Sequence, residues 1–295
     1  MKMKIKKSRS QIIFNILGYT LVSLVAVMCL VPFIMMISGS VSDETLIGKY
    51  GYSILSRGFS LEAYSTIFKN PMQILNAYKN TILITVVGTA VALLVNAMTA
   101  YVLSRKDFKY RNKFAFFFYF TTLFNGGMVS TYIFMIRYYN LKDSYIALIL
   151  PFVINAFYLL VMRSFMADIP VSLIESAKLD GAGEFTIFIK VILPLAKTGL
   201  ATIGLFIALD YWNDWYNTML YISDSSKFTL QYLLYNMLSS AEAMASVTSS
   251  VGTGALPTQT MKLAMAIVAA GPVIFVYPFV QKYFVKGITV GAVKG

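Results

Sequence analysis

The chain has 295 residues, of which 58% are hydrophobic and 13% charged, and its mean hydropathy is +0.68. Soluble domains average about 25% charged residues, so this composition excludes an ordinary soluble domain and indicates a protein that has lipid as its solvent. The formal charge is +12, but the basic residues are dispersed at the ends of apolar runs and form no basic stripe. Nucleic acid is therefore not expected as a partner.

Two residue types limit the chemistry that the chain can perform. It contains no histidine, which removes the commonest general base and the commonest metal ligand. Its single cysteine, Cys29, excludes an intrachain disulfide and lies in an apolar run, where a buried and inert thiol is expected. We predict no catalytic residue, no metal site and no cofactor bound by this chain.

Six apolar runs are long enough to cross a hydrocarbon core of about 30 Å as helices of about 20 residues. They predict an all-α polytopic membrane protein with one transmembrane domain, residues 12–284, between short tails at 1–11 and 285–295. The predicted spans are Ile12–Ile37, Thr81–Val102, Phe114–Ile136, Ile146–Met166, Val191–Trp212 and Leu263–Phe284. The first run follows a basic stretch, as a secretory signal does, but it is too long and lacks a clear cleavage site, so we interpret it as a retained helix.

The distribution of basic residues predicts the orientation in the membrane. Of the 25 Lys and Arg residues, 17 lie on the side that holds the amino terminus, residues 105–113, the segment 163–197 and the carboxyl tail. Because basic residues accumulate on the cytoplasmic side, both termini and the polar segment 167–190 are predicted to be cytoplasmic. The long connections 38–80 and 213–262 are then external. A Ser60-Leu61-Glu62 helix start lies in the first of them.

The polar segment 167–190 interrupts two apolar runs. Pro170 should end the fourth span, and Ser172 should cap a new helix with Glu175 in capping-box register. Asp180-Gly181 then predicts a helix stop and a turn before Leu193-Pro194. The segment is either a solvated, well-capped loop or a docking surface, and its exposed acidic pair and small residues favour docking.

Several motifs carry a resemblance to a known family. Glu175-Ser176-Ala177, Asp180-Gly181-Ala182 and Ile192-Leu193-Pro194 resemble the EAA loop of binding-protein-dependent ABC-importer permeases, with Ser176 in place of an alanine. The likeness extends along nearly the whole chain, through Ala100–Lys106, Gly126-Gly127 and the tail Gly291–Gly295. It is similar to the maltose-type carbohydrate group, and nearest its branch for complex oligosaccharides, including uronic-acid sugars.

The resemblance implies a multi-subunit importer. Expected partners are a homologous second permease, two ATPase subunits that hold ATP and Mg²⁺, an extracytoplasmic sugar-binding protein, an oligosaccharide and membrane lipid. The chain has no Gly-x-x-x-x-Gly-Lys-Ser/Thr phosphate loop, which agrees with a separate ATPase. The residues implied to contact the ATPase are Glu175, Ser176, Ala177, Asp180, Gly181, Ala182 and, at the tail, Gly295. The alternative for the tail is a frayed membrane-proximal end.

Polar residues inside or beside spans are candidates for the substrate pathway. Asp210 lies nearly a turn inside an apolar run, where a charge is costly, so it should face the pathway or a partner helix. The remaining pathway candidates are Asn155, Tyr158, Tyr211, Trp212, Asn213 and Asp214. A helix–helix hydrogen bond is the equal alternative for Asn155, and Trp215 and Tyr216 are better explained as interfacial anchors.

The second external connection offers a contact for the binding protein. Its Gly-bearing stretch carries Pro257, Thr258 and Gln259, and its alternative is a disordered linker. The sequence thus indicates the permease subunit of an ATP-driven oligosaccharide importer. The alternatives are an ABC permease for another solute, an ion-coupled carrier and a non-transporting membrane scaffold. The near absence of charges inside the spans argues against the ion-coupled carrier.

Overall fold

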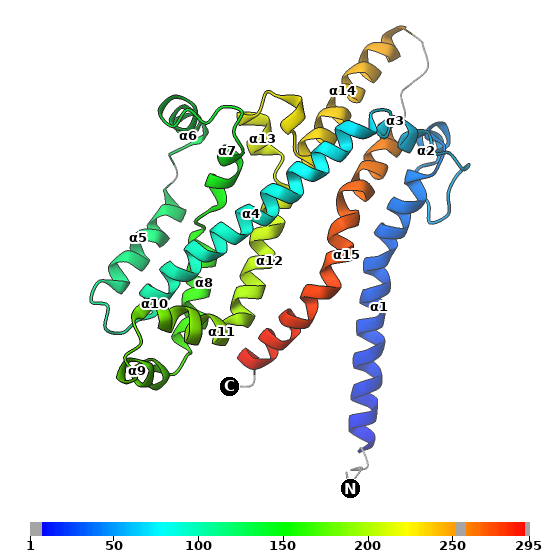
Figure 1. The fold of residues 1–295 in the computed structure, drawn as a ribbon. Helices are drawn as coiled ribbons and strands as arrows, with labels where there is room; N and C mark the ends of the chain where they lie inside the picture. Colours follow the sequence, from blue (N-terminus) through cyan, green and yellow to red (C-terminus); the bar gives the residue numbers. More distant parts are fainter. Residues whose placement is uncertain (1–7, 125, 252–257, 293–295) are drawn as a thin grey trace. The chain divides into compact units, whose positions relative to one another are not determined.

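The computed structural model describes residues 8–124, 126–251 and 258–292, and these are mostly helical, without a named β-strand (Figure 1). One isolated bridge joins Ser42 and Phe59. The chain divides into two compact units, one made of residues 1–69 and 237–271 and the other of residues 70–236 and 272–295. The all-α membrane class predicted from composition is confirmed.

The first unit is dominated by α1 (Arg9–Ser40), whose most apolar stretch is not buried at all within the protein. Its 32 residues give a length of about 48 Å, enough to cross a bilayer. Cys29 lies exposed on this helix, so the prediction of a buried thiol is wrong. The reason is that the apolar surroundings of Cys29 are surface that only lipid or another chain can cover.

Two short helices follow α1 in the same unit. Asp43 caps α2 (Glu44–Tyr50) by accepting the amide protons of Thr45 and Leu46 at 2.9 and 3.2 Å. The predicted helix start at Ser60-Leu61-Glu62 is confirmed, since α3 (Glu62–Ile67) begins there and the Ser60 hydroxyl accepts the amide proton of Glu62.

The carboxylate of Glu44 links distant parts of the first unit. It accepts the backbone amide protons of Gln259 and Thr260, each at 2.8 Å, in the first turn of α15 (Thr258–Ala292). Unpaired amides and the helix dipole make this turn attractive to an anion. Glu44 therefore caps a helix that begins more than 200 residues later in the chain.

The second unit is built on α4 (Pro71–Ser104), which packs against α8 (Ala156–Ala167) and α12 (Lys197–Asn213) (Figure 1). The buried positions of α4 recur every three or four residues, so one stripe of the helix faces its neighbours. They include Ala77, Thr81, Ile84, Gly88, Ala92, Asn96, Ala100 and Leu103. Small residues dominate the stripe, which allows the close helix approach common in membrane bundles.

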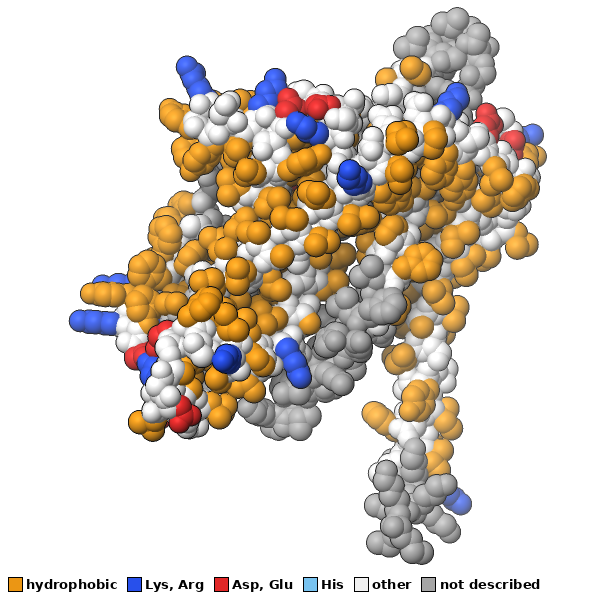
Figure 2. Space-filling view, in the orientation of Figure 1, with side chains coloured by type: hydrophobic (Ala, Val, Ile, Leu, Met, Phe, Trp, Pro, Cys, Tyr) orange, Lys and Arg blue, Asp and Glu red, His pale blue; other side chains and the backbone are white. Residues whose placement is uncertain are grey.

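Buried polar groups fix the neighbours of α4. Asn96 donates to the carbonyl of Val153 at 2.8 Å, and Asn80 donates to the carbonyls of Ser226 and Phe228 at 2.8 and 3.1 Å. Thr81 accepts the amide proton of Leu230 at 2.8 Å. In the view of Figure 2, charged side chains of this unit gather at its two ends and apolar side chains cover the band between them. This is the surface expected of a membrane-embedded bundle.

Three of the six predicted spans are continuous helices that are long and apolar enough to cross a membrane: Arg9–Ser40, Pro71–Ser104 and Thr258–Phe275. The fourth is a pair, Tyr145–Phe152 and Ala156–Ala167, bent by 54°, and the fifth is a pair, Glu184–Leu195 and Lys197–Asn213, bent by 83°. Pro151 and Pro194 lie in the amino-terminal member of each pair, where a proline removes a helical hydrogen bond. Counting each pair as one span gives five in the described part of the chain.

The third predicted span, Phe114–Ile136, does not form one helix. It divides into α5 (Arg111–Leu123) and α6 (Met128–Ile133), followed by a π-helical turn, Phe134–Tyr138. Phe124 is extended and Gly127 has φ +86°, a conformation that breaks a right-handed helix. An uninterrupted apolar run concealed this break.

The connection 213–262 is mostly helical rather than a long loop. It contains α13 (Tyr216–Tyr221), a short turn at Ser225–Lys227 and α14 (Leu230–Val251). Thr218 and Thr229 are buried and hydrogen-bonded to one another at 2.9 Å. Its Ser, Gly and Thr content near Ser246–Gly254 suggested a flexible loop, but α14 extends to Val251, and residues 252–257 lie outside the described part of the chain.

Candidate functional site at the Glu175 loop

The loop 167–190, called the Glu175 loop below, contains α9 (Val171–Leu179) and α10 (Glu184–Ile187). Pro170, not Ser172, stands at the helix start, and no side chain caps α9. The predicted capping box is therefore wrong. The physical reason is that the fixed φ of Pro170 starts the helix one residue before Ser172, so Ser172 already lies inside the first turn.

The end of α9 follows the prediction. Asp180 is the cap residue, and Gly181 has φ +80°, the left-handed conformation that favours glycine. The amide of Ala182 then donates to the carbonyl of Ala177 at 2.9 Å, which closes the turn. The Asp180-Gly181 stop is confirmed, and it reverses the chain sharply into α10.

The outer face of this loop is exposed to its surroundings. Glu175, Ser176, Asp180 and Gly181 are exposed, while Ala177 and Ala182 are half-buried. Among the described residues, neither Glu175 nor Asp180 has a hydrogen-bond or ion-pair partner for its side chain. Leu179 is 89% exposed beside Asp180, and Phe185 is 66% exposed. The sequence does not indicate that these two residues are exposed, because an apolar residue at the end of a helix usually points into a core.

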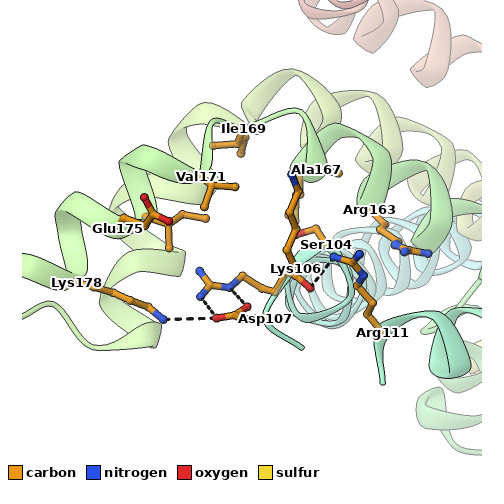
Figure 3. Close-up of a pocket in the computed structure, with 13 residues that line it drawn as sticks. Ser104, Lys106, Asp107, Arg111, Arg163, Ala167, Ile169, Val171, Glu175 and Lys178 are labelled. Atoms are coloured by element: carbon orange, nitrogen blue, oxygen red, sulfur yellow. Dashed lines mark hydrogen bonds and ion pairs between the residues drawn. The ribbon is translucent and has the colours of Figure 1, made fainter. Parts of the chain in front are cut away.

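A groove lies between the Glu175 loop, the end of α8 and the turn after α4 (Figure 3). It has a volume of about 610 Å³. Its charged lining consists of Arg105, Lys106, Asp107, Arg111, Arg163, Glu175 and Lys178. Arg163 donates to the carbonyl of Leu103 at 3.0 Å and to the Asn112 side chain at 3.1 Å, which ties α8 to the ends of α4 and α5.

A network of charged groups joins this loop to α4. Arg105 makes a bidentate pair with Asp107, with Nε 2.9 Å from Oδ1. Lys178 lies 2.8 Å from Glu184 and 3.7 Å from Asp107. The hydrogen bond from Arg105 holds the pKa of Asp107 below its usual range. Each partly solvated pair contributes about 0.2–1 kcal/mol, so the network orients the loop more than it stabilises the fold. None of these pairings was predicted.

The candidate pathway residues divide into two groups. Tyr158 on α8 donates its hydroxyl proton to Asp210 on α12 at 2.8 Å, so both predicted residues meet. Asn155 caps α8, where its side chain accepts the amide protons of Phe157 and Tyr158 at 2.9 and 3.3 Å. Asp210 therefore faces a neighbouring helix of the same chain. A partner helix was one of the two alternatives for it, and the substrate pathway was the other.

The aromatic pair that follows Asp210 is buried. Tyr211 is 1% exposed, and its hydroxyl donates to the carbonyl of Ile149 at 2.7 Å. Trp212 is 8% exposed. Asn213 bonds to Gln231 at 3.3 Å, and Asp214 accepts the amide proton of Asn217 at 3.1 Å. A role of these four residues in the substrate pathway stays a prediction.

The proposed binding-protein contacts lie at the head of α15. Thr258 and Gln259 form its first turn, and Gln259 accepts a hydrogen bond from the Tyr52 hydroxyl at 2.9 Å. Pro257 and the tail residue Gly295 lie outside the described residues.

An all-α bundle with apolar helices long enough to cross a membrane, bent candidate spans and an exposed polar helix–turn–helix is the architecture expected of a membrane permease subunit. Residues 113–290 match the family model described as "Binding-protein-dependent transport system inner membrane component", and the chain belongs to this family. It is therefore the membrane-embedded transport component of an ABC transporter, as the motifs of the Glu175 loop predicted.

Relatives align along nearly the whole chain. One is the "Polygalacturonan/rhamnogalacturonan transport system permease protein YtcP" of Bacillus subtilis, 40% identical over 96% of this chain and 99% of that protein. Another is "Protein LplC" of the same organism, 37% identical over 96% of this chain and 95% of that protein. A solved bacterial ABC transporter "involved in the import of the acidic polysaccharide alginate" contains a chain with TM-score 0.77 and 32% identity. The match covers 95% of this chain and all of that one.

Proposed function

We propose that this chain is one of two homologous permeases in an importer for oligosaccharides that contain uronic acids. The observation that carries the substrate class is the 40% identity, over almost the full length, to a permease named for polygalacturonan and rhamnogalacturonan. The fold match to a transporter of an acidic polysaccharide supports the same class. Two ATPase subunits and an extracytoplasmic binding protein complete the assembly.

In this proposal the Glu175 loop and both termini are cytoplasmic. The excess of Lys and Arg in alternate loops supports this orientation. So does the groove, where two of the Lys- and Arg-rich segments, 105–113 and 163–178, meet at one end of the second unit. The external side then holds the head of α15 and the connection 213–262.

The Glu175 loop is the docking surface for one ATPase. Its exposed helix presents two carboxylates, Glu175 and Asp180, that have no partner within the described residues. The exposed Leu179, directly before Asp180, supplies an apolar anchor beside them. An apolar residue rimmed by charged groups is a common arrangement at protein interfaces. Closure of the ATPase pair on ATP would move this loop and the helices attached to it.

A co-purification experiment tests the docking surface. The double variant Glu175→Ala/Asp180→Ala should bind the ATPase at least about tenfold more weakly, because a combined cost of about 1.4 kcal/mol for truncating two interface residues is a factor of ten. Glu62→Ala is the matched control, since this exposed carboxylate lies in the other unit. Full recovery of the ATPase with the double variant would refute the docking role.

The substrate class is tested with proteoliposomes that contain the complete transporter and its binding protein. We expect ATP-dependent accumulation of labelled trigalacturonate and little accumulation of maltotriose, a neutral sugar of similar length. Preferential uptake of maltotriose, or uptake of neither sugar by a complex that hydrolyses ATP, contradicts the proposed substrate.

A further inference from the structure

The carboxylate of Glu184 connects three helices at the inner end of the second unit. Its Oε1 lies 2.8 Å from Nζ of Lys178 on α9, and its Oε2 accepts the hydroxyl proton of Tyr101 on α4 at 2.7 Å. Glu184 itself is the first residue of α10. One side chain therefore holds both arms of the Glu175 loop and the last turn of α4.

A second charged link runs beside the first. Arg105, directly after α4, pairs with Asp107 and lies 3.6 Å from Glu184. Lys178 points toward Asp107 across the groove, at 3.7 Å (Figure 3). The four charged groups thus form a ring of ion pairs with two cations and two anions. These four residues and Tyr101 are called the α4 clasp below.

The clasp rests on a buried aromatic contact. Tyr101 is 6% exposed, and its ring centroid lies 5.5 Å from that of Phe188, which is 3% exposed. The polar link is therefore formed at the edge of a packed core, and the Tyr101 hydroxyl has a fixed direction. Packed side chains transmit displacement, since protein interiors are dense and stiff.

The α4 clasp binds the end of α4, which is the central helix of the second unit. The buried stripe of α4 contacts both α8 and α12, and these two helices carry Tyr158 and Asp210. A movement of α9 that is passed to α4 is consequently passed to both helices. Besides the clasp, the Tyr101–Phe188 ring contact joins the end of the Glu175 loop to α4.

We propose that Glu184, with Tyr101 and Arg105, is a positioning group that makes the Glu175 loop and α4 move together. The inference rests on the proposed docking role of this loop but assigns a separate task to different residues. Glu175 and Asp180 hold the ATPase, whereas the clasp passes its movement into the membrane helices. Loss of the clasp should leave ATPase binding intact and reduce the transport obtained from each ATP.

The first test measures coupling in proteoliposomes that contain the whole transporter. Glu184→Gln removes the charge that faces Lys178, and Tyr101→Phe removes the hydroxyl while it keeps the ring on Phe188. Each should lower labelled trigalacturonate uptake per ATP hydrolysed by about 2- to 30-fold, the range expected for residues that couple distant sites. Glu62→Gln is the control and should leave this ratio unchanged. An unchanged ratio in both clasp variants would overturn the inference.

The second test needs no substrate. With Cys29→Ser as background, spin labels at Ser172 on α9 and Val102 on α4 report the distance between the two helices. Both positions are exposed. In the otherwise native chain we expect one narrow distance distribution that ATP and Mg²⁺ do not widen, and in Glu184→Gln a broader distribution. The same distribution in both proteins shows that the clasp does not hold α9 to α4.

The outcomes separate this inference from the docking role. Failure of Glu175→Ala/Asp180→Ala to release the ATPase contradicts the docking surface. Loss of ATPase binding in Glu184→Gln contradicts the division of tasks, because the clasp would then be part of the interface. Normal binding together with a lowered uptake ratio and a broadened distance supports the inference.

Discussion

The contact between Gly88 and Tyr211 offers the sharpest test of the packing in the second unit. A Cβ atom at Gly88 would lie 2.6 Å from Cζ and 2.8 Å from Cε1 of Tyr211. The ring has little room to yield, since Tyr211 is 1% exposed, its hydroxyl is bonded to Ile149 at 2.7 Å, and its ring centroid lies 5.3 Å from that of Phe152. Gly88→Ala must therefore displace α4 or α12.

The magnitude follows from a comparison with a second glycine. Gly18 on α1 has no atom within 4 Å of its would-be Cβ, so Gly18→Ala gains helix propensity without a clash. Gly88→Ala gains the same propensity and adds overpacking, which costs about 1–3 kcal/mol. The two variants should therefore differ in stability by this overpacking cost. At about 2 °C per kcal/mol for a chain of this size, the melting temperature of Gly88→Ala should be about 2–6 °C lower than that of Gly18→Ala.

The assay is thermal unfolding of the purified complex in detergent, followed by intrinsic fluorescence at one scan rate. Gly204→Ala provides an intermediate case, because its would-be Cβ lies 3.3 Å from Leu93. We expect the melting temperature to fall in the order Gly18→Ala, Gly204→Ala, Gly88→Ala. Tyr211→Leu should relieve the Gly88→Ala clash, so the two changes together cost less than their sum. Equal melting of Gly18→Ala and Gly88→Ala would refute the packing argument.

Three further predictions concern other parts of the chain. Tyr158→Phe and Asp210→Leu should each lower uptake while the complex still assembles and hydrolyses ATP, and normal uptake at normal expression removes both residues from the pathway. Glu44→Gln should lower stability by about 1 kcal/mol, seen as a lower melting temperature than that of the exposed control Glu62→Gln, because the amides at the head of α15 lose a charged acceptor. Leu179→Ser should reduce ATPase recovery with no change in melting temperature, and unchanged recovery excludes this leucine from the interface.

The elements of the fold that depend on local pattern were predictable. Apolar length identified α1 and α4, and Asp180-Gly181 marked the turn of the Glu175 loop because only glycine readily adopts its φ of +80°. The exact start of α9 was not, since Pro170 and Ser172, two residues apart, are both plausible positions for a helix start. The break between α5 and α6 was not predicted because hydropathy carries no information about backbone conformation.

The groups that join separate elements could not be read from the sequence. Tyr101 and Glu184 are 83 residues apart, and each has an ordinary local environment for a tyrosine in a helix or a glutamate at a helix start. The packing of the segment after α10, Phe188–Ile192, against α4 brings them together. Tyr158 and Asp210 were both singled out, but nothing in their spacing indicated that they bind one another. The α4 clasp therefore became visible only in three dimensions.

The bond between Glu44 and the head of α15 also has a consequence for biosynthesis. The ribosome must add about 215 residues after Glu44 before the amide groups that donate to its carboxylate exist. At about 5–20 residues per second this takes roughly 10–40 s. During that interval α1 and α2 have left the ribosome while Glu44 still lacks these partners, so the first unit is completed only when the last membrane helix has been inserted.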